Sequence, residues 1–512
     1  MKKRALVSVS DKTDLIPFVK GLVECGYEII STGGTYKALK EAGIDCLGIE
    51  EVTHFPEILD GRVKTLHPMV HGGLLAVRDL ESHQKQLKEN HIETIDLVCV
   101  NLYPFKQTIS KEGFTHAEAI ENIDIGGPSM LRSAAKNHAY VTVVCDVKDY
   151  EQVLNEIKEN GDTSLATRQR LAAKVYRTTA SYDAMIAQYM SDYVQEENPE
   201  SLTMTFDLKQ TLRYGENPHQ KASFYSEMFT TPYSLCSAKQ LHGKELSYNN
   251  IQDANATLEI LRDFEGSSAV VAVKHMNPCG IGVASDLYTA WRKAYEADTT
   301  SIFGGIVAFN ETVTVQIAEE LSKMFLEIIL APAFEEEAFE ILSRKKNIRL
   351  MTFTKEAQKE YVRKFVSVSG GILVQDTDRA VTRAEDCKCV TEKQPTEKEM
   401  EDLLFGFKVV KHVKSNAIVI VKDGQTLGVG AGQMNRVGAA KIALEQAGEK
   451  ARGAVLASDA FFPMDDTVKL ASEYGISAII QPGGSIKDED SIKACNENQV
   501  SMVFTGKRHF KH

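Results

Sequence analysis

Residues 267–279 read SSAVVAVKHMNPC, and this stretch decides the fold class of the second half of the chain. Positions 269–273 are small apolar or β-branched residues without polar alternation, which is typical of a strand buried on both faces. The strand runs directly into Lys274, His275 and Asn277. Open α/β folds bind ligands at the carboxyl ends of their strands, so the pattern predicts a functional crevice here. For an isolated segment, a polar turn would be the simpler interpretation.

The same pattern occurs a second time in the chain. Residues 267–282 (SSAVVAVKHMNPCGIG) align without a gap with residues 415–430 (SNAIVIVKDGQTLGVG). The segments share strand residues, one Lys and two Gly, and Lys293 falls opposite Lys441 in the helix expected after each. Chance similarity of two buried strands would explain the aliphatic residues but not the Lys and the two Gly together. The alignment therefore predicts two copies of one α/β unit, each a strand, a turn, a second strand and a helix.

The two copies differ at the turn. His275 and Asn277 of the first copy are replaced by Asp423 and Gln425 in the second. The shared residues therefore indicate scaffold, whereas His275 and Asn277 indicate a specialised role. Lys274 fits either interpretation, because its counterpart is also a lysine.

Length and composition narrow the class of protein. A chain of 512 residues predicts two to four domains, and 43% hydrophobic with 25% charged residues is typical of soluble globular proteins. The nine scattered Cys favour reduced thiols, and we find neither a signal peptide nor a long apolar run. A net charge of −12 argues against a nucleic-acid surface. We therefore expect a cytoplasmic enzyme with no membrane or nucleic-acid partner.

The first ~130 residues alternate strand and helix at short spacing, which predicts a doubly wound parallel sheet. We expect strands at 5–9, 27–31, 97–101 and 141–144, and helices at 35–42 and from a Ser10-Asp11 cap to about residue 24. A long helical region over 164–194 and a linker at 195–200 follow. Strands near 202–206 open the second half, and residues 383–401 fit an exposed connector.

Two glycine-rich turns in the first half are candidates for phosphate binding. Residues 31–35 (STGGT) and 124–128 (DIGGP) each lie before an expected helix, where backbone amides and the helix dipole favour an anion. Such turns are weak evidence alone, since many are only tight turns.

Further polar groups lie near these turns in the predicted fold. The loops 61–68 (GRVKTLHP) and 101–105 (NLYPF) and the helix after residue 128 bring cations, a phenol and a carboxylate. Lys64, Tyr103, Asp124 and Lys136 would surround a phosphate site, although each alone would be an ordinary surface residue. Arg132 and Lys136 lie on one helix face, where they could simply complement the helix dipole.

The second half contains a motif that looks like a metal site. Residues 275–279 (HMNPC) resemble half of a zinc-deaminase signature, but Asn277 stands where that mechanism needs Glu, and the chain has no C-x-x-C. We therefore expect no metal. His275 is then predicted to be a general base, and Lys274 a proton donor or oxyanion stabiliser. Residues 213–220 (RYGENPHQ) form another unusual polar loop.

Seven motifs in order along the whole chain resemble one enzyme family. STGGT, GRVKTLHP, NLYPF, DIGGPSMLR-x-AAKN, LRYGENPHQ, KHMNPCG and GAGQMNR are similar to the bifunctional purine-biosynthesis enzymes that join AICAR transformylase to IMP cyclohydrolase. The resemblance implies an α/β fold with a methylglyoxal-synthase-like N-terminal domain and two cytidine-deaminase-like subdomains. The implied boundaries are a cyclohydrolase domain at 1–146, a helical extension and linker at 147–200, and transformylase subdomains at 201–385 and 386–512.

The resemblance also implies the chemistry. AICAR is formylated by 10-formyltetrahydrofolate, and the product FAICAR closes its ring with loss of water to give IMP, at two separate sites. The implied catalytic residues are Lys274 and His275 in the transformylase and Lys64, Tyr103, Asp124 and Lys136 in the cyclohydrolase. The implied substrate-binding residues are Ser10, Lys12, Ser31, Thr32, Gly33, Gly34, Thr35, Arg62, Thr65, Asn101, Gly126 and Gly127 in the first half, and Arg213, Tyr214, Asn277, Asn416 and Arg508 in the second.

Members of the family are homodimers that need no metal, which is the expectation for this chain. Glu327 departs from the Asp expected in relatives, so its role stays open. Two other interpretations remain at this point: a non-catalytic nucleotide-sensing protein, and a zinc-dependent nucleotide deaminase. The first explains the glycine-rich loops but not the presence together of all six implied catalytic residues. Metal in the purified protein would favour the second.

Overall fold

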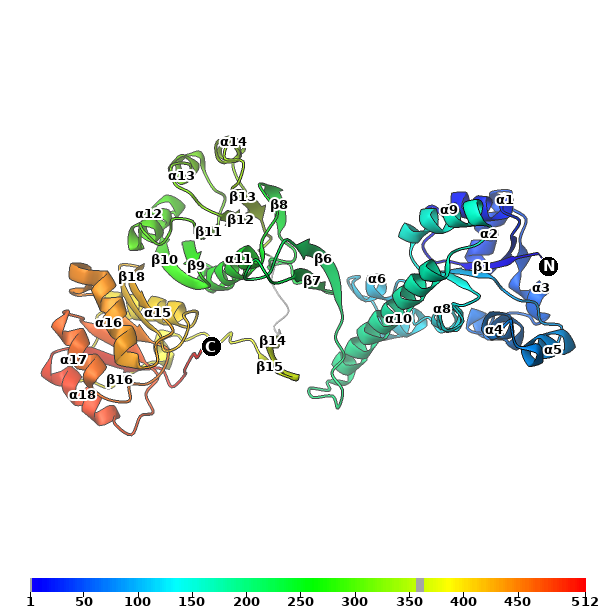
Figure 1. Ribbon diagram of the computed structural model, residues 1–512. Coiled ribbons are helices and arrows are strands. Elements are labelled where there is room, and N and C mark those ends of the chain that lie inside the picture. The colour runs from blue at the N-terminus through cyan, green and yellow to red at the C-terminus, as the bar shows by residue number, and fades with distance from the viewer. Residues whose placement is uncertain (1, 356–362) are drawn as a thin grey trace. The chain divides into compact units, whose positions relative to one another are not determined.

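The computed structural model describes residues 2–355 and 363–512, which fold as two compact units, Met1–Phe206 and Asp207–His512 (Figure 1). The division follows the predicted linker closely. Each unit is described by itself below.

The first unit is built on one parallel sheet, as the sequence predicts. In residues 2–206 the strand order is β3-β2-β1-β4-β5, and every neighbouring pair is parallel. From β1 the chain first adds β2 and β3 on one side and then β4 and β5 on the other. The topological switch point therefore lies between β1 and β4. The strands are β1 (Arg4–Ser8), β2 (Glu28–Ser31), β3 (Leu47–Gly48), β4 (Leu97–Val100) and β5 (Thr142–Val144).

Helices cover this sheet. The helix cap expected at Ser10-Asp11 is wrong. The first helix begins at Leu15, because Asp14 adopts a left-handed conformation (φ 52°), so Ser10 and Asp11 lie in the preceding loop rather than capping the helix. The helices are α1 (Leu15–Glu24), α2 (Gly33–Glu41), α3 (Ile49–Thr53), α4 (Pro68–Leu75), α5 (Glu81–Glu89), α6 (Phe105–Ile109), α7 (His116–Glu121), α8 (Gly126–Lys136), α9 (Tyr150–Asn160) and α10 (Leu165–Val194).

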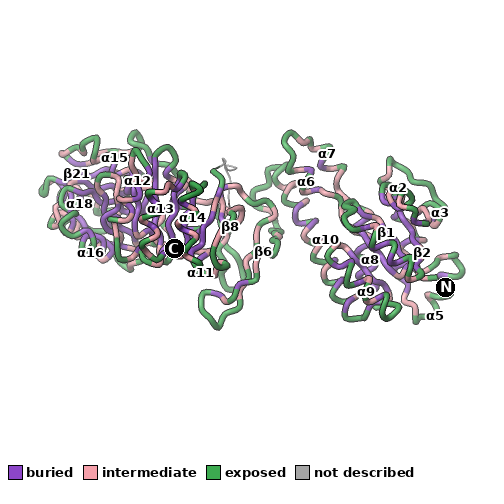
Figure 2. Tube along the Cα trace, turned by 90° about the horizontal axis from the view of Figure 1, so that it is seen from above, coloured by how far each residue is buried: buried purple, intermediate pink, exposed green. Residues whose placement is uncertain are grey.

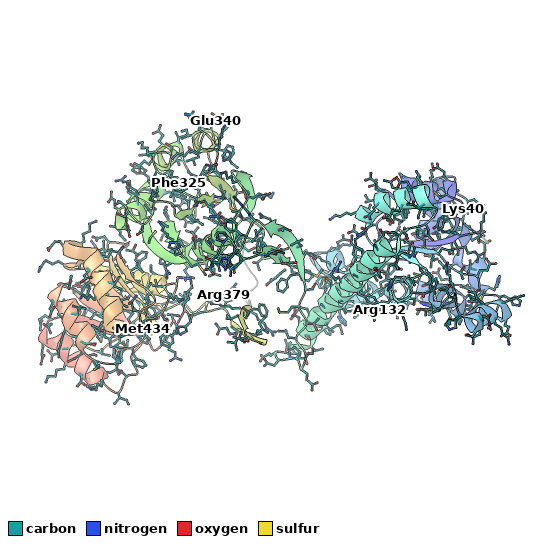
Figure 3. All side chains as sticks on the ribbon, in the orientation of Figure 1. Lys40, Arg132, Phe325, Glu340, Arg379 and Met434 are labelled. Atoms are coloured by element: carbon teal, nitrogen blue, oxygen red, sulfur yellow. The ribbon has the colours of Figure 1, made fainter. Side chains whose placement is uncertain are left out.

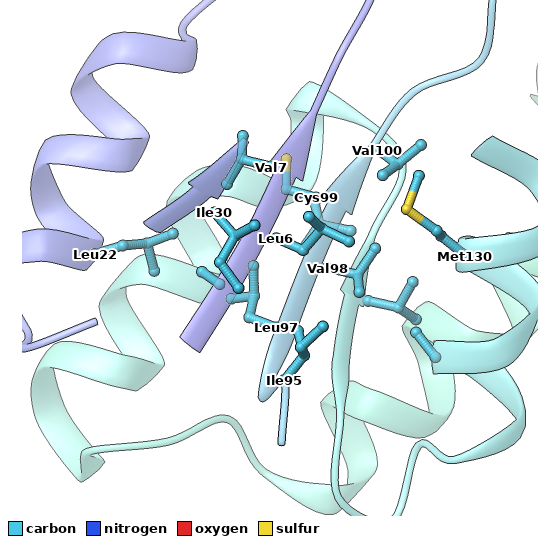
Figure 4. Packing of buried hydrophobic residues seen from close by; sticks show 14 of the residues in the cluster. Leu6, Val7, Leu22, Ile30, Ile95, Leu97, Val98, Cys99, Val100 and Met130 are labelled. Carbon is cyan, nitrogen blue, oxygen red and sulfur yellow. The ribbon is translucent and has the colours of Figure 1, made fainter. Parts of the chain in front are cut away.

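The core of the first unit extends beyond the sheet domain expected at 1–146. Leu6, Val98 and their neighbours on β1 and β4 are fully buried between helices (Figure 4). Val153 of α9 and Leu171 of α10 belong to the same apolar cluster. The helical extension therefore packs on the core of the sheet.

The second unit contains both copies of the repeat in a single sheet. Among its described residues, twelve strands follow the order β16-β21-β20-β19-β17-β18-β10-β9-β11-β12-β13-β8. The two hairpins β9–β10 and β17–β18 meet at the centre, where β10 pairs with β18. Three parallel strands and one short antiparallel strand flank each hairpin, so the repetition extends well beyond the segment visible in the sequence.

The elements of the second unit follow the same sequence in both copies. The first copy has β8 (Lys239–His242), α11 (Tyr248–Leu261), β9 (Ser268–Lys274), β10 (Asn277–Ala284), α12 (Leu287–Ala297), β11 (Ile306–Phe309), α13 (Val315–Leu321), β12 (Ile328–Ala331), α14 (Glu336–Ser343) and β13 (Arg349–Thr352). The second has β16 (Lys388–Cys389), α15 (Glu397–Val410), β17 (Ile418–Lys422), β18 (Gln425–Gly430), α16 (Arg436–Ala447), β19 (Val455–Ser458), α17 (Asp466–Glu473), β20 (Ala478–Gln481), α18 (Asp488–Glu497) and β21 (Ser501–Phe504).

Strand β9 is buried on both faces, as predicted. Val271 and Val273 contribute to one apolar cluster, and Val270 and Ala272 contribute to another on the opposite face. Burial is concentrated along the strands, and the exposed residues lie mainly in loops and on outer helix faces (Figure 2).

The glycines shared by the two copies allow close helix packing. A Cβ added at Gly280 would lie 2.1 Å from the backbone oxygen of Ala294 in α12, and one at Gly428 would lie 1.9 Å from that of Ala443 in α16. Gly282 and Gly430 are equally crowded by backbone. No side chain fits there, which explains why the copies share these residues.

Two local expectations for the second unit are wrong. Its first strand is β6 (Phe206–Leu212), paired with β7 (Ala222–Glu227), so residues 202–205 lie outside it. The supposed connector at 383–401 contains β16, which pairs with β21, and the first turns of α15. A separate hairpin, β14 (Arg363–Val368) with β15 (Gly371–Asp376), precedes it.

Candidate active sites

A cavity of about 560 Å³ opens at the carboxyl edge of the sheet in the first unit, at the switch point. It lies among the loops after β1, β2 and β4 and the start of α8. Of the predicted residues, it is lined by Ser10, Lys12, Thr32, Gly33, Gly34, Thr35, Arg62, Lys64, Thr65, Asn101, Tyr103, Asp124, Gly126 and Gly127. The structure thus brings together nearly all predicted cyclohydrolase residues.

Several of these side chains hold the loops of the cavity. Asn101 accepts hydrogen bonds from the backbone N–H groups of Ser10 (2.6 Å) and Asp11 (3.1 Å), which fixes the loop after β1. Thr35 bonds both backbone groups of Val9. Ser31 is buried, donates to the carbonyl of Val7 and lies outside the cavity lining.

The first turn of α2 is suited to binding an anion. Thr32, the residue directly before α2, makes no side-chain hydrogen bond to the backbone amides of the first helical turn. Its side chain therefore does not compete with an anion for those amides. Two ammonium groups face the same turn: Lys64 Nζ lies 3.8 Å from the position of a Cβ at Gly33, and Lys12 Nζ 3.9 Å from that at Gly34. Uncapped amides and two cations together form a phosphate-sized anion site.

A carboxyl group and a phenol lie in the same cavity. Burial raises the pKa of Asp124, although its bonds from the N–H groups of Gly127 (2.8 Å) and Tyr103 (3.4 Å) and the charge of Lys64 oppose the shift. Burial and the nearby charge of Asp124 also raise the pKa of Tyr103. The phenol therefore keeps its proton at neutral pH, and the carboxyl group is a weaker acid than usual, which suits both groups to proton transfer.

Lys136 is not brought into this cavity. It is the exposed last residue of α8, whereas the cavity contacts the first residues of that helix. At 1.5 Å per residue, the two ends are about 15 Å apart. Arg132, labelled in Figure 3, lies over the ring of Tyr176 in α10 at 5.4 Å, so it packs on the helical extension. Arg62 pairs with Glu121 at the rim.

In the second unit, the polar cluster that follows β9 lies on a tight turn. His275 (φ 55°) and Met276 (φ 62°) are both left-handed, as in a type I′ turn between paired residues Lys274 and Asn277. The carboxylate of Asp253, on α11, accepts the N–H of Met276 at 2.7 Å.

Lys274 makes the same contact as its counterpart. Its ammonium group donates to the carbonyl of Phe303 at 2.8 Å, and Lys422 donates to the carbonyl of Arg452 at 3.0 Å. A structural role for the lysine is therefore common to both copies, and a catalytic role for Lys274 stays a prediction.

Asn277 connects the turn to the second copy. Its side-chain oxygen accepts the N–H of Lys414 at 3.1 Å, and its amide nitrogen donates to the carbonyl of His275 at 3.1 Å. The next residues of the second copy lead to Asn416, which accepts from Arg436 at 2.7 Å. The segment that carries Asn416 is thus held beside the turn that carries His275.

The C-terminal segment is anchored, not frayed. His509 is 3% exposed, and it bonds Asp378 at 2.5 Å and the backbone oxygen of Asp459 at 2.9 Å. The carbonyl of Lys511 accepts the N–H of Ser415, one residue before Asn416, and the N–H of Lys511 donates to the hydroxyl of Ser415. Arg508, directly before the first of these anchors, is exposed and lies over the ring of Phe510 at 4.9 Å. Buried and exposed residues alternate here, which is the pattern of a fixed extended segment.

The loop with Arg213 and Tyr214 lies near the start of α11. The amide of Asn249 donates to the carbonyl of Glu216 at 3.3 Å, and Arg213 stacks on Tyr214 at 5.6 Å. Glu327, whose role was open, pairs with the mostly buried Arg349 of the neighbouring strand at 2.7 Å.

Sequence reasoning missed the groups that hold these residues in place. Asp253, Asp378 and Asp459 are the main examples, and each bonds a segment far away in the chain. The alignment of the two copies began after α11 and so did not reach Asp253. In residues 2–355 and 363–512, no cluster of three or more His, Cys, Asp or Glu side chains could hold a metal ion, and no helix is long and apolar enough to cross a membrane.

Comparison with known families assigns both units. The model of a family described as "AICARFT/IMPCHase bienzyme" matches residues 134–446, and that of a family described as "MGS-like domain" matches residues 14–129. The second match confirms the expected methylglyoxal-synthase-like fold at the N-terminus.

Curated relatives that match over the full length support the same family. The chain is 61% identical over 512 residues to "Bifunctional purine biosynthesis protein PurH" of Anoxybacillus flavithermus, with 100% of both chains covered. It is 60% identical over 512 residues to the protein of the same name from Bacillus thuringiensis, again with 100% of both covered. A solved structure described as "Crystal structure of ForH" matches 36% of this chain and 98% of its own at 37% identity, with a TM-score of 0.33.

Proposed function

Since this chain belongs to the AICARFT/IMPCHase bienzyme family and is a bifunctional formyltransferase and cyclohydrolase, we propose that its two units hold the two activities in separate sites. The first unit cyclises FAICAR to IMP, and the second transfers the formyl group of 10-formyltetrahydrofolate to AICAR. The proposal rests chiefly on the gathering of a phosphate site, Asp124 and Tyr103 in one cavity of the first unit. The two other interpretations of the sequence, a nucleotide sensor and a zinc deaminase, are superseded by the family.

In the proposed cyclohydrolase site, the nucleotide phosphate binds at the first turn of α2, between Lys12 and Lys64. The carboxamide nitrogen of FAICAR attacks its formyl carbon, and one water leaves as the ring closes. The departing oxygen becomes water by taking up two protons, one lost from the attacking carboxamide nitrogen and one lost from the formamide nitrogen as the C=N bond forms. Asp124 and Tyr103 serve these transfers, because burial raises the pKa of both and keeps the phenol protonated.

In the proposed transformylase site, His275 removes a proton from the AICAR amine as that nitrogen attacks the formyl carbon. The bond from the formyl carbon to the folate nitrogen then breaks, and the folate nitrogen takes up a proton, so tetrahydrofolate and FAICAR leave. Lys274 stabilises the oxyanion, and Asn277, Asn416, Arg508, Arg213 and Tyr214 bind the nucleotide. The contact of Asn277 with the segment that precedes Asn416 supports this grouping.

Two single variants test the separation of the sites. We expect His275→Ala to abolish formyl transfer and leave FAICAR cyclisation intact, and Lys64→Ala to do the reverse. Both rates are measured on the same purified sample, with AICAR and 10-formyltetrahydrofolate in one assay and FAICAR in the other. Equal loss of both activities in a folded His275→Ala protein would refute two independent sites.

We also propose that the protein is a homodimer in the cytoplasm. The hairpin β14–β15 supports the dimer, because Val366, Ile372 and Leu373 are each at least 41% exposed on a sheet of only two strands. An isolated hairpin with exposed apolar residues on both strands is marginally stable, and a second copy that covers it would stabilise it.

Light scattering after gel filtration tests the dimer. We expect twice the chain mass for the native protein and a shift towards one chain mass for a Val366→Lys, Leu373→Lys double variant. The exposed charged position Lys441 provides the control, since Lys441→Ala should leave the mass unchanged. A native protein of one chain mass at micromolar concentration would contradict the proposal.

A further inference from the structure

The turn that carries His275 has a conformation that its own residues do not favour. Type I′ turns select Asn and Gly at their two central positions, because both residues adopt positive φ. Here the positions hold His275 and Met276, at φ 55° and 62°. The equivalent turn of the second copy has Asp423 and Gly424, of which the glycine adopts positive φ without steric cost. The surrounding structure must therefore hold the first turn in place more firmly than the second.

Asp253 makes the contacts that do this. It lies on α11, far from the turn in sequence, and its carboxylate accepts the backbone N–H of Met276 at 2.7 Å. Burial raises the pKa of Asp253, while bonds from the N–H groups of Met276 and His275 and the charge of His275 oppose the shift. One half-buried carboxylate thus bonds the N–H of Met276 and lies close to that of His275.

The second copy also has an aspartate that bonds the backbone of the turn, but its turn lacks the histidine. The carboxylate of Asp402, on α15, accepts the N–H of Asp423 and that of Gly424, both at 2.8 Å. The two helices precede equivalent strands, so the contact is part of the repeated scaffold. In the first copy the scaffold bond falls on Met276, next to His275.

We propose that Asp253 is a positioning residue for formyl transfer: by bonding the backbone N–H of Met276, it holds the turn and so fixes the direction in which the imidazole of His275 points towards the AICAR amine. This inference rests on the proposed role of His275. Asp253 need not touch the substrate, because it acts through the backbone of the turn. A base displaced by about 1 Å can lose about 10²-fold in rate, so a fixed turn has a direct effect on the reaction.

The experiment compares Asp253→Ala and Asp253→Asn in the full-length protein. We expect Asp253→Ala to lower kcat for formyl transfer by about 10²-fold, with little change in the KM for AICAR, since the nucleotide contacts remain. Asp253→Asn should recover most of this loss, because its amide oxygen can accept the same N–H bond. Cyclisation of FAICAR in the same sample should match the native rate, because it takes place in the other unit.

Asp402→Ala provides the matched control, since it removes the same kind of contact from a turn without His275. It should lower the melting temperature of the protein without lowering kcat for formyl transfer. Equal loss of kcat in Asp402→Ala and Asp253→Ala would show that Asp253 is only structural. Native kcat in Asp253→Ala, a loss confined to KM, or an Asp253→Asn protein as slow as Asp253→Ala would each overturn positioning through the turn. A native protein without formyl transfer would instead refute the proposed function.

Discussion

Thr35 shows how a residue in a phosphate-binding sequence can serve the loop beside it. It is 3% exposed, and its hydroxyl donates to the carbonyl of Val9 at 2.9 Å and accepts the N–H of Val9 at 3.0 Å. Both hydrogen-bonding roles of that hydroxyl are therefore used within the chain. The bonds hold the end of β1, from which Ser10 and Lys12 enter the cavity. In the proposed phosphate site, Thr35 would therefore act through these neighbours.

We predict that Thr35→Val, which keeps the shape of the side chain, destabilises the first unit by about 1–3 kcal/mol, because it leaves two buried backbone groups of Val9 unpaired. The KM for FAICAR should rise, since Ser10 and Lys12 lose their fixed position. Chemical unfolding measures the first effect and steady-state kinetics the second. Formyl transfer should not change, and a Thr35→Val protein with native stability would contradict the role assigned to this hydroxyl.

Contacts between distant segments limit how much of each site the sequence can predict. The family resemblance implied most of the residues that line the first cavity. Those after β1, β2 and β4 lie at the carboxyl ends of parallel strands, which share one edge, whereas residues 62–65 and 124–127 follow helical turns. The resemblance did not predict Asp253 or Asp378, whose partners, Met276 and His509, lie on distant segments. Nor could it indicate that α8 carries Lys136 away from the cavity. Such facts depend on tertiary packing.

At the scale of elements, a buried charge cluster joins the two copies of the repeat. Asp263, just after α11, accepts bonds from Lys411 (2.6 Å) and His412 (2.7 Å), just after α15. Burial alone would raise the pKa of Asp263, but the bonds and charges of His412 and Lys411 outweigh it and lower the pKa to about 2. Burial lowers the pKa of His412, although its bond to Asp263 and the charge of that carboxylate oppose the shift.

This shift predicts a pH dependence. A carboxyl group whose pKa falls from 3.8 to about 2 on folding stabilises the folded state above pH 3.8, and this stability is lost as the pH falls towards 2. Asp263→Asn should therefore cost about 2 kcal/mol or more at pH 7, and the difference from the native protein should shrink below pH 4. Guanidinium unfolding of both proteins at pH 7, 4 and 3 measures it.

The control for this prediction is Asp465→Asn. Asp465 is also paired, with Lys469 at 2.8 Å, but on the surface of one helix. Solvent and salt screen such a pair, so its loss should not change stability measurably. Equal effects of the two substitutions would contradict the importance of burial in the cluster at Asp263.

The elements themselves were largely predictable where the sequence had a strong period. Apolar runs predicted β1, β2, β4, β5 and β9 to within a residue or two, and the helical region expected over 164–194 corresponds to α10. The sequence did not predict the helix start at Leu15 or the strand β16. The first depends on a left-handed Asp14, and the second is two residues long and exists through its pairing with β21. Neither has a periodic signal.

At the scale of the whole molecule, each apolar core lies within one unit, and one core of the second unit spans both copies of the repeat. Within the described residues, one cluster draws only on the first unit and three draw only on the second. One of those three contains both Val271 of the first copy and Val419 of the second. Pairing of β10 with β18 and the cluster at Asp263 add to this junction. The units are therefore separable, whereas the copies depend on each other.

This difference predicts the outcome of dividing the chain. A fragment of residues 1–206 should fold cooperatively and cyclise FAICAR at the native rate, because it retains its whole core and every residue of its cavity. Residues 207–512 should retain formyl transfer. Fragments 207–385 and 386–512 should each expose half of the shared core, bind a hydrophobic dye and lack formyl transfer until mixed. Circular dichroism and the two assays measure these outcomes, and an independently folded, active 207–385 fragment would refute the shared core as the basis of the second unit.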